Sequence, residues 1–169
     1  MEKTIHILNQ MAADRVIADY AIGGAIAATF WAEPVTTYDL DVFVVLPESE
    51  MRKAVLTLDK LYGYLKAKGY RAHAEHVIIE GIPVQFLPVY NELIAEAVAK
   101  SAKTKYGQVE AKVVRLEYLL AIMASVGRPK DRARIAHVME TAEPNQKRLR
   151  DILDRHGLFK KWESLAGRI

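Results

Sequence analysis

Apolar and polar residues follow two different periods along this chain. Residues 2–18 repeat apolar side chains at helical spacing, as at Ile5 and Leu8. Residues 38–46 form a Val-rich, nearly continuous apolar run, which is typical of a strand covered on both faces. The pattern predicts helices over residues 2–18, 25–31, 49–68, 91–100, 116–126, 130–141, 144–156 and 158–165, strands over residues 20–22, 38–46, 71–79, 82–89 and 111–114, and a basic linker over residues 101–108.

The order of these elements predicts the fold class. Helices and strands are mixed up to about residue 115, and only helices follow. This order is typical of an α/β (α+β) core that continues into a helical part. We therefore expect a core over residues 1–115 with residues 116–169 packed on it as a helical C-terminal part.

Composition excludes several classes of protein. Of the 169 residues 51% are hydrophobic, which argues against a disordered chain, and the absence of cysteine excludes disulfides, thiol catalysis and cysteine-ligated zinc. The longest weakly polar run, residues 21–32, is too short to span a bilayer, and the first ten residues lack the plan of a secretion signal. A cytoplasmic protein without a membrane partner is expected.

Charge is distributed unevenly along the chain. Residues 1–99 carry 8 Lys/Arg and 13 Asp/Glu, whereas residues 100–169 carry 16 and 8. The split predicts an acidic half able to bind metal and a basic half able to meet phosphates. The alternative is that the helices of the second half carry Lys and Arg on solvated faces.

Two carboxylates interrupt the most apolar strand. Asp39 and Asp41 are two residues apart, so a strand directs both to the same face, where their charges repel. A divalent cation would relieve this repulsion, because hard cations prefer carboxylate oxygens. The alternative is a pair of solvated aspartates on an edge strand.

A glycine pair upstream changes the balance between these alternatives. Gly23 and Gly24 lie between a predicted strand and a predicted helix. Glycines allow a ligand to approach the backbone closely, and a helix start offers free N–H groups, so phosphate is the natural ligand. Phosphate binding beside a metal held by aspartates is the arrangement used in phosphoryl and nucleotidyl transfer.

With these motifs the sequence resembles the polymerase-β-like nucleotidyltransferase superfamily. The matching features are Ile22-Gly23-Gly24 followed by Asp39-Leu40-Asp41-Val42. Thr37, two residues before the first aspartate, and the Arg128-Pro129-Lys130-Asp131 element resemble small bacterial abortive-infection and toxin–antitoxin nucleotidyltransferases.

The resemblance implies a mixed β-sheet flanked by helices and an enzyme that binds a nucleoside triphosphate with Mg²⁺. It implies transfer of a nucleotidyl group to a hydroxyl of a protein, an RNA or a small molecule. Asp39 and Asp41 would ligate the metal, and Gly23 and Gly24 would cradle the phosphates. Thr37 would belong to the same nucleotide site. The phosphate-facing candidates in the basic half are Arg128, Lys130, Arg132 and Arg134, of which Lys130 lies near the start of a predicted helix.

One departure from the resemblance bears on catalysis. Active members carry a third carboxylate on a neighbouring strand, and the matching position here is Gln85, which cannot act as a base. If Glu80-Gly81 forms a two-residue turn, His76 lies opposite Gln85 on the same face and is a candidate general base.

Two readings without catalysis therefore stand beside the enzyme. In the first, the chain is a weak or inactive nucleotide-binding module, such as one partner of a toxin–antitoxin-like pair. In the second, it binds nucleic acid through residues 100–169, although few aromatic residues are interleaved with the basic ones and the net charge is only +3.

Overall fold

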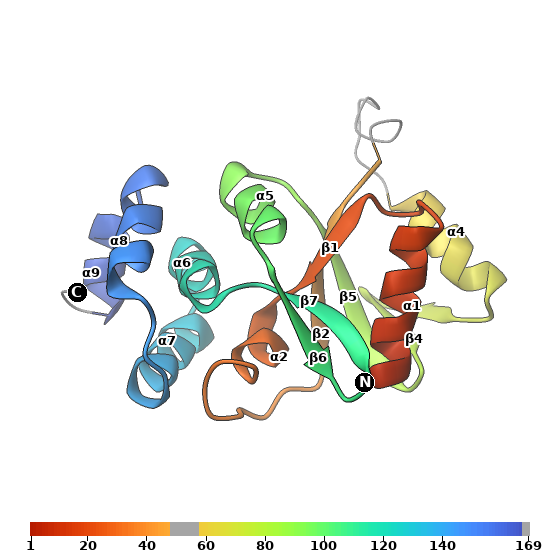
Figure 1. Cartoon of the computed structure of the whole chain (residues 1–169), viewed down its shortest axis with the longest axis horizontal. Coiled ribbons are helices and arrows are strands. Elements are labelled where there is room, and N and C mark those ends of the chain that lie inside the picture. The colour runs from red at the N-terminus through yellow and green to blue at the C-terminus, as the bar shows by residue number, and fades with distance from the viewer. Residues whose placement is uncertain (48–57, 167–169) are drawn as a thin grey trace.

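A computed structural model describes residues 1–47 and 58–166 and shows a single mixed β-sheet with helices on both faces (Figure 1). The sheet has seven strands in the order β3-β4-β5-β2-β1-β7-β6. The strands are β1 (Asp19–Ile22), β2 (Leu40–Val45), β3 (Arg71–His73), β4 (His76–Ile79), β5 (Ile82–Pro88), β6 (Ala102–Tyr106) and β7 (Val109–Val113).

Strand directions make the sheet mixed, as predicted. β2 runs antiparallel to β1 and parallel to β5, and β1 runs parallel to β7. The two outer pairs, β3 with β4 and β6 with β7, are antiparallel hairpins. The strand with the two aspartates therefore lies at the centre of the sheet, which excludes the alternative of an edge strand.

The helices form layers on either side of this sheet. On one face α1 (Glu2–Ala13) and α4 (Asp59–Ala67) lie side by side, and the hydroxyl of Tyr64 donates to Asp14 at 2.5 Å. On the opposite side lie α2 (Gly24–Ala28) and α5 (Glu92–Ala99), both of which contact β2 (Figure 1).

The C-terminal helices extend the second layer. They are α6 (Leu116–Val126), α7 (Pro129–Thr141), α8 (Gln146–Arg155) and α9 (Phe159–Ala166). α6 is buried along nearly its whole length because it contacts α2 and α5 on one side and α7, α8 and α9 on the others. The division at residue 115 stays a prediction, although α6 begins at the predicted residue.

Two predictions about strands were wrong. Residues 71–79 form two strands, because a tight turn at Ala74, with φ of 54°, separates β3 from β4. The predicted basic linker contains β6, which pairs with β7 from Ala102 opposite Val113 to Tyr106 opposite Val109. The alternating lysines leave this segment without an apolar pattern, so the sequence does not indicate a strand here. A strand at a sheet edge can still pair through its backbone, because it needs no apolar face to do so.

Several predicted helix boundaries also shift. The first helix ends at Ala13, five residues early, and the helix after the glycine pair ends at Ala28 instead of Trp31. The predicted start of the next helix at Ser49 lies outside the described residues, and α4 is its described part. Within residues 1–47 and 58–166, no helix has the length and apolarity needed to cross a membrane.

Candidate functional site

The carboxylate of Asp41 lies directly against the glycine pair. A Cβ atom added to Gly24 would fall 1.8 Å from Oδ2 of Asp41, so only glycine leaves room for this side chain. Gly24 also adopts a φ of +59°, which favours glycine. Two motifs that are far apart in the sequence therefore meet at one point.

Gly23 is fixed by the same strand. Its backbone N–H donates to the carbonyl of Asp41 at 2.9 Å, which continues the antiparallel pairing of β1 and β2. A Cβ atom at Gly23 would lie 2.5 Å from the ring of Phe43. Both glycines are thus required by packing on β2, and their contact with phosphate stays a prediction. α2 has only five residues, so its dipole adds little for an anion.

Asp39 precedes β2 and has two polar neighbours. The hydroxyl of Thr37 donates to its Oδ1 at 3.0 Å. Nε2 of His76 lies 3.9 Å from its Oδ2, and this nitrogen is buried with no hydrogen-bond partner. His76, at the start of β4, is therefore a neighbour of the segment that contains Thr37 and Asp39.

Gln85 occupies the position beside Asp41. The parallel register of β2 and β5 places Asp41 directly opposite Gln85. β4 and β5 pair Val77 with Val84 and Ile79 with Ile82, which confirms the register predicted from the Glu80-Gly81 turn. Gln85 is the residue at which the resemblance implies a third carboxylate, and its neutral amide lies next to Asp41.

The N-terminus of α7 supplies positive charge to the site. The carboxylate of Asp131, only 2% exposed, accepts hydrogen bonds from the backbone N–H of Arg128 at 3.1 Å and from its Nε at 2.8 Å. A further bond from the guanidinium, at 3.2 Å, fixes the side chain of Arg128. These hydrogen bonds raise the pKa of Arg128, which remains charged.

A cavity of about 300 Å³ lies between Asp41 and Gln85 on the sheet and the arginines at the start of α7, and its apolar lining comes mainly from α6. Of the residues predicted for the site, Gly23, Thr37, Asp39 and His76 do not line it. The lining residues are Gly24, Asp41, Phe43, Gln85, Leu87, Tyr90, Leu119, Ile122, Met123, Val126, Arg128, Asp131 and Arg134.

Of the four basic candidates at residues 128–134, Arg128 and Arg134 line this cavity. Lys130 and Arg132 do not line it, although the charge of Lys130 acts on Asp41. Sequence reasoning missed Tyr90. Tyr90 carried no signal, because it lies in the loop between β5 and α5.

Burial leaves the charge of Asp41 poorly compensated. Burial raises the pKa of Asp41, and the nearby charge of Asp39 raises it further. Arg134, Lys130 and Arg128 act in the opposite direction without cancelling these effects. The ionised pair therefore favours a bound cation.

The donor set fits Mg²⁺ held together with a substrate. Within the described ranges, no three His, Asp or Glu side chains form a metal cluster. Mg²⁺ seldom uses such a cluster, since it usually takes one or two carboxylates, several waters and substrate phosphates. Asp39 and Asp41 would supply the two carboxylates, and the basic groups of α7 face the same cavity.

Comparison with known proteins identifies the fold. No family model matches the sequence, and no curated protein matches it significantly. The crystal structure of an antigenic nucleotidyltransferase-like protein from Paracoccidioides brasiliensis matches with a TM-score of 0.58 and 16% identity, covering 99% of this chain and 93% of that one. ANT(2")-Ia in complex with adenylyl-2"-tobramycin matches with a TM-score of 0.53 and 12% identity, covering 94% and 96%.

These matches define a class of fold. The mixed sheet and its flanking helices form a nucleotidyltransferase-like fold, as the resemblance implied. The glycine pair and the two aspartates lie together within it. At 16% and 12% identity, the matches establish the fold and leave substrate and metal to be argued from the site.

Proposed function

We propose that this chain binds a nucleoside triphosphate with Mg²⁺ in the cavity between the sheet and α7, and transfers its nucleotidyl group to a hydroxyl. The observation that carries the proposal is the arrangement of Asp41 against Gly24, facing Arg128 and Arg134 across one cavity. Carboxylates for a metal and guanidinium groups for phosphates are the two requirements of this chemistry.

In the proposed reaction the acceptor oxygen attacks the α-phosphorus of the triphosphate. A new P–O bond forms, the bond to the β-phosphate oxygen breaks, and pyrophosphate leaves. Mg²⁺, held by Asp39 and Asp41, would neutralise phosphate charge when bound. Arg128 and Arg134 orient the phosphates, and the exposed ring of Tyr90 offers a surface for the base.

The acceptor hydroxyl must also lose a proton. His76 is the candidate to receive it, because its buried Nε2 has no hydrogen-bond partner and lies 3.9 Å from Oδ2 of Asp39. Gln85 cannot take this role, since an amide is neither an acid nor a base near neutral pH. A protein, an RNA or a small molecule remains the proposed acceptor.

The direct test is transfer of label from α-³²P-labelled nucleoside triphosphates in the presence of Mg²⁺ and cell extract. We expect label to appear on one acceptor with wild-type protein and to be absent with the Asp39→Ala/Asp41→Ala double variant. The class of labelled molecule then identifies the acceptor. If no label is transferred to any acceptor, and no triphosphate raises the melting temperature of the protein, the proposed nucleotide site does not exist.

A second candidate function is nucleotide binding without turnover, possessed by an inactive member of the fold or by one partner of a toxin–antitoxin-like pair. The position of Gln85 directly opposite Asp41 favours it, because this is where a third carboxylate would complete the site.

A Gln85→Asp variant separates the two functions. If Gln85 is the element that limits chemistry, the variant should gain transfer activity by about 10²-fold, the usual effect of a positioned general base. Gln85→Asn, which changes length without adding charge, is the matched control. Equal activity of wild type and Gln85→Asp would show that the third carboxylate is dispensable here.

A further inference from the structure

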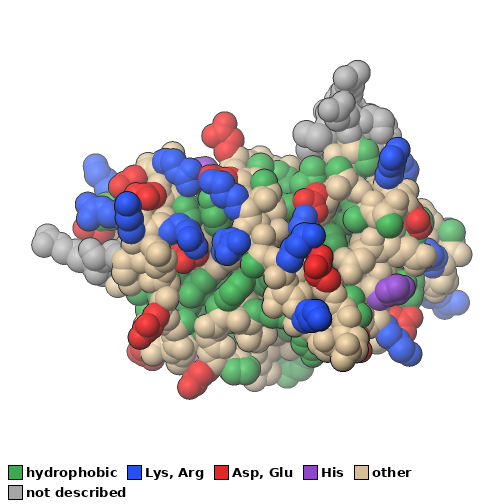
Figure 2. Space-filling view, viewed as in Figure 1, with side chains coloured by type: hydrophobic (Ala, Val, Ile, Leu, Met, Phe, Trp, Pro, Cys, Tyr) green, Lys and Arg blue, Asp and Glu red, His purple; other side chains and the backbone are tan. Residues whose placement is uncertain are grey.

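A second, larger cavity lies at the start of α6, whereas the candidate active site is lined by residues further along this helix. Its volume is about 910 Å³, three times that of the candidate active site, and it opens between the end of α5, the start of α6 and α8. Lys and Arg side chains gather on this face of the molecule over the same elements (Figure 2). We call this cavity the basic groove.

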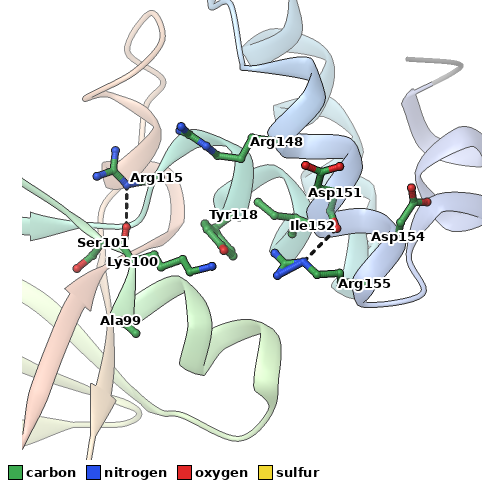
Figure 3. A pocket seen from close by; sticks show the side chains of 10 residues that line it. All are labelled: Ala99, Lys100, Ser101, Arg115, Tyr118, Arg148, Asp151, Ile152, Asp154 and Arg155. Carbon is green, nitrogen blue, oxygen red and sulfur yellow. Dashed lines mark hydrogen bonds between the residues drawn. The ribbon is translucent and has the colours of Figure 1, made fainter.

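Four cationic side chains line the basic groove, one at the end of α5, one at the start of α6 and two on α8: Lys100, Arg115, Arg148 and Arg155 (Figure 3). Arg148 extends from α8 toward Arg115, and Lys100 and Arg155 point toward each other. Like charges on facing walls repel unless an anion lies between them.

Lys100 and Arg155 form ion pairs with the same carboxylate, that of Glu96. Glu96 accepts Nζ of Lys100 at 2.5 Å and the guanidinium of Arg155 at 2.8 Å, while Nε2 of His156 lies 2.9 Å from its other oxygen. Burial alone would raise the pKa of Glu96, but hydrogen bonds from Lys100, His156 and Tyr118 outweigh it and lower the pKa to about 2. One negative charge thus faces two permanent positive charges.

The positive charges of the other two residues, Arg115 and Arg148, are neutralised even less by carboxylates. Nε of Arg115 donates to the carbonyl of Lys100 at 2.8 Å, and across the described chain no carboxylate forms an ion pair with it. Arg148 lies 3.7 Å from Glu117, whose other oxygen already accepts the backbone N–H of Asn145. Both guanidinium groups therefore keep most of their donors available.

The polar lining of the basic groove also includes Ser101 and two acids. Ser101 lines the groove, but its Oγ is inaccessible to solvent and has no hydrogen-bond partner. A ligand in the groove does not reach this oxygen, so the four cationic side chains are the groups available to bind one. The groove also contains two acids of α8, Asp151 and Asp154, which lie on the side away from Arg115 and Ser101 (Figure 3).

From these contacts we propose that the basic groove binds the phosphate backbone of a nucleic acid strand. Guanidinium groups recognise phosphate through paired N–H donors, and Arg115 and Arg148 present such donors on one side of the groove (Figure 3). Cations spread over three elements match successive phosphates better than one isolated anion. Tyr118, the aromatic residue of the lining, is only 2% exposed and cannot stack with bases, so binding is independent of sequence.

The test is fluorescence anisotropy with an end-labelled single-stranded RNA of 12 nucleotides, in EDTA, over a series of KCl concentrations. Compared with wild type, Arg115→Ala/Arg148→Ala should bind about tenfold more weakly, because two charged hydrogen-bond donors are lost. Its log K against log[salt] slope should become shallower by about 1.4, since each contact to a single strand contributes about 0.7. Lys60→Ala/Lys105→Ala removes two exposed charges elsewhere and should leave the affinity within about twofold.

The melting temperature of Arg115→Ala/Arg148→Ala separates binding from folding. Both side chains are exposed, so the melting temperature of the variant should stay close to that of wild type while its RNA affinity falls. The proposal is overturned if RNA does not bind, or if Arg115→Ala/Arg148→Ala binds as wild type does. It is equally overturned if poly-glutamate, or inorganic phosphate at the same phosphate concentration, displaces the RNA as well as unlabelled RNA does.

Discussion

An Asp41→Asn variant is expected to lose the Mg²⁺-dependent response to nucleoside triphosphates while its metal-free form unfolds at the same or a higher temperature than wild type. The pKa of Asp41 is raised above its ordinary value of 3.8 by burial and by Asp39. The folded chain thus binds this proton more tightly than the unfolded chain. The contribution to stability is present at pH below 3.8 and is lost as the pH rises through the folded pKa.

At neutral pH the ionised Asp41 therefore costs stability, and Asn removes that cost. With Mg²⁺ and a triphosphate the order reverses, because a ligand that binds only the folded wild type raises its melting temperature. Transfer activity, where present, should fall by about 10²–10³-fold, as on removal of one preorganised electrostatic group.

Thermal unfolding with and without Mg²⁺ and each triphosphate checks this prediction. Asp154→Asn, an exposed aspartate on α8, is the matched control and should respond as wild type does. An equal rise in melting temperature for wild type and Asp41→Asn would contradict the metal site, because the variant keeps the shape of the side chain and loses only its charge.

A Gly24→Ala variant should lose both stability and ligand binding. The new Cβ would fall 1.8 Å from Oδ2 of Asp41 and 2.7 Å from its Cγ, so the carboxylate must rotate out of its present position. Ala also disfavours the φ of +59° at this residue. We expect a loss of about 2–4 kcal/mol in the free energy of unfolding, the sum of strain and overpacking, and loss of the Mg²⁺-dependent thermal shift.

Gly157→Ala is a close control for the backbone term. Gly157 has a φ of +65° and nothing within 4 Å of its added Cβ, so the variant should lose only the strain of that conformation. In an Asp41→Ala background, Gly24→Ala should cost less than in wild type, because the carboxylate contacts at 1.8 Å and 2.7 Å are absent and only the Cβ of residue 41, at 2.9 Å, remains close. Urea unfolding curves of the four variants measure these differences. Equal losses for Gly24→Ala and Gly157→Ala would show that Asp41 does not depend on the missing Cβ.

The centre of the site could be predicted because strand geometry determines it. A period of two places Asp39 and Asp41 on one face, and a two-residue turn fixes the register that brings His76 toward Gln85. The structure confirms that register and the position of Gln85 opposite Asp41. Each of these relations involves residues of one strand or of two strands joined by a short turn, so each can be predicted from the sequence.

The opposite wall of the site was only partly predictable. The rotation of α7 on α6 decides that Arg134 lines the cavity while Arg132 instead reaches the carbonyl of Ser164. Both lie in the same helix with similar surroundings in the sequence. Packing between helices selects one of them, and no periodicity within α7 contains that information. Tyr90 lies in a loop, and its position likewise depends on tertiary packing that the local sequence does not specify.

The two edges of the sheet have a consequence for solubility and self-association. β6 closes one edge with Lys103 and Lys105 exposed, and β3 closes the other with three exposed residues that include Arg71 and His73. A second copy of the chain that added its own edge strand would bring these like charges together and leave them poorly hydrated. The lysines that hid β6 in the sequence therefore protect the sheet from edge-to-edge aggregation.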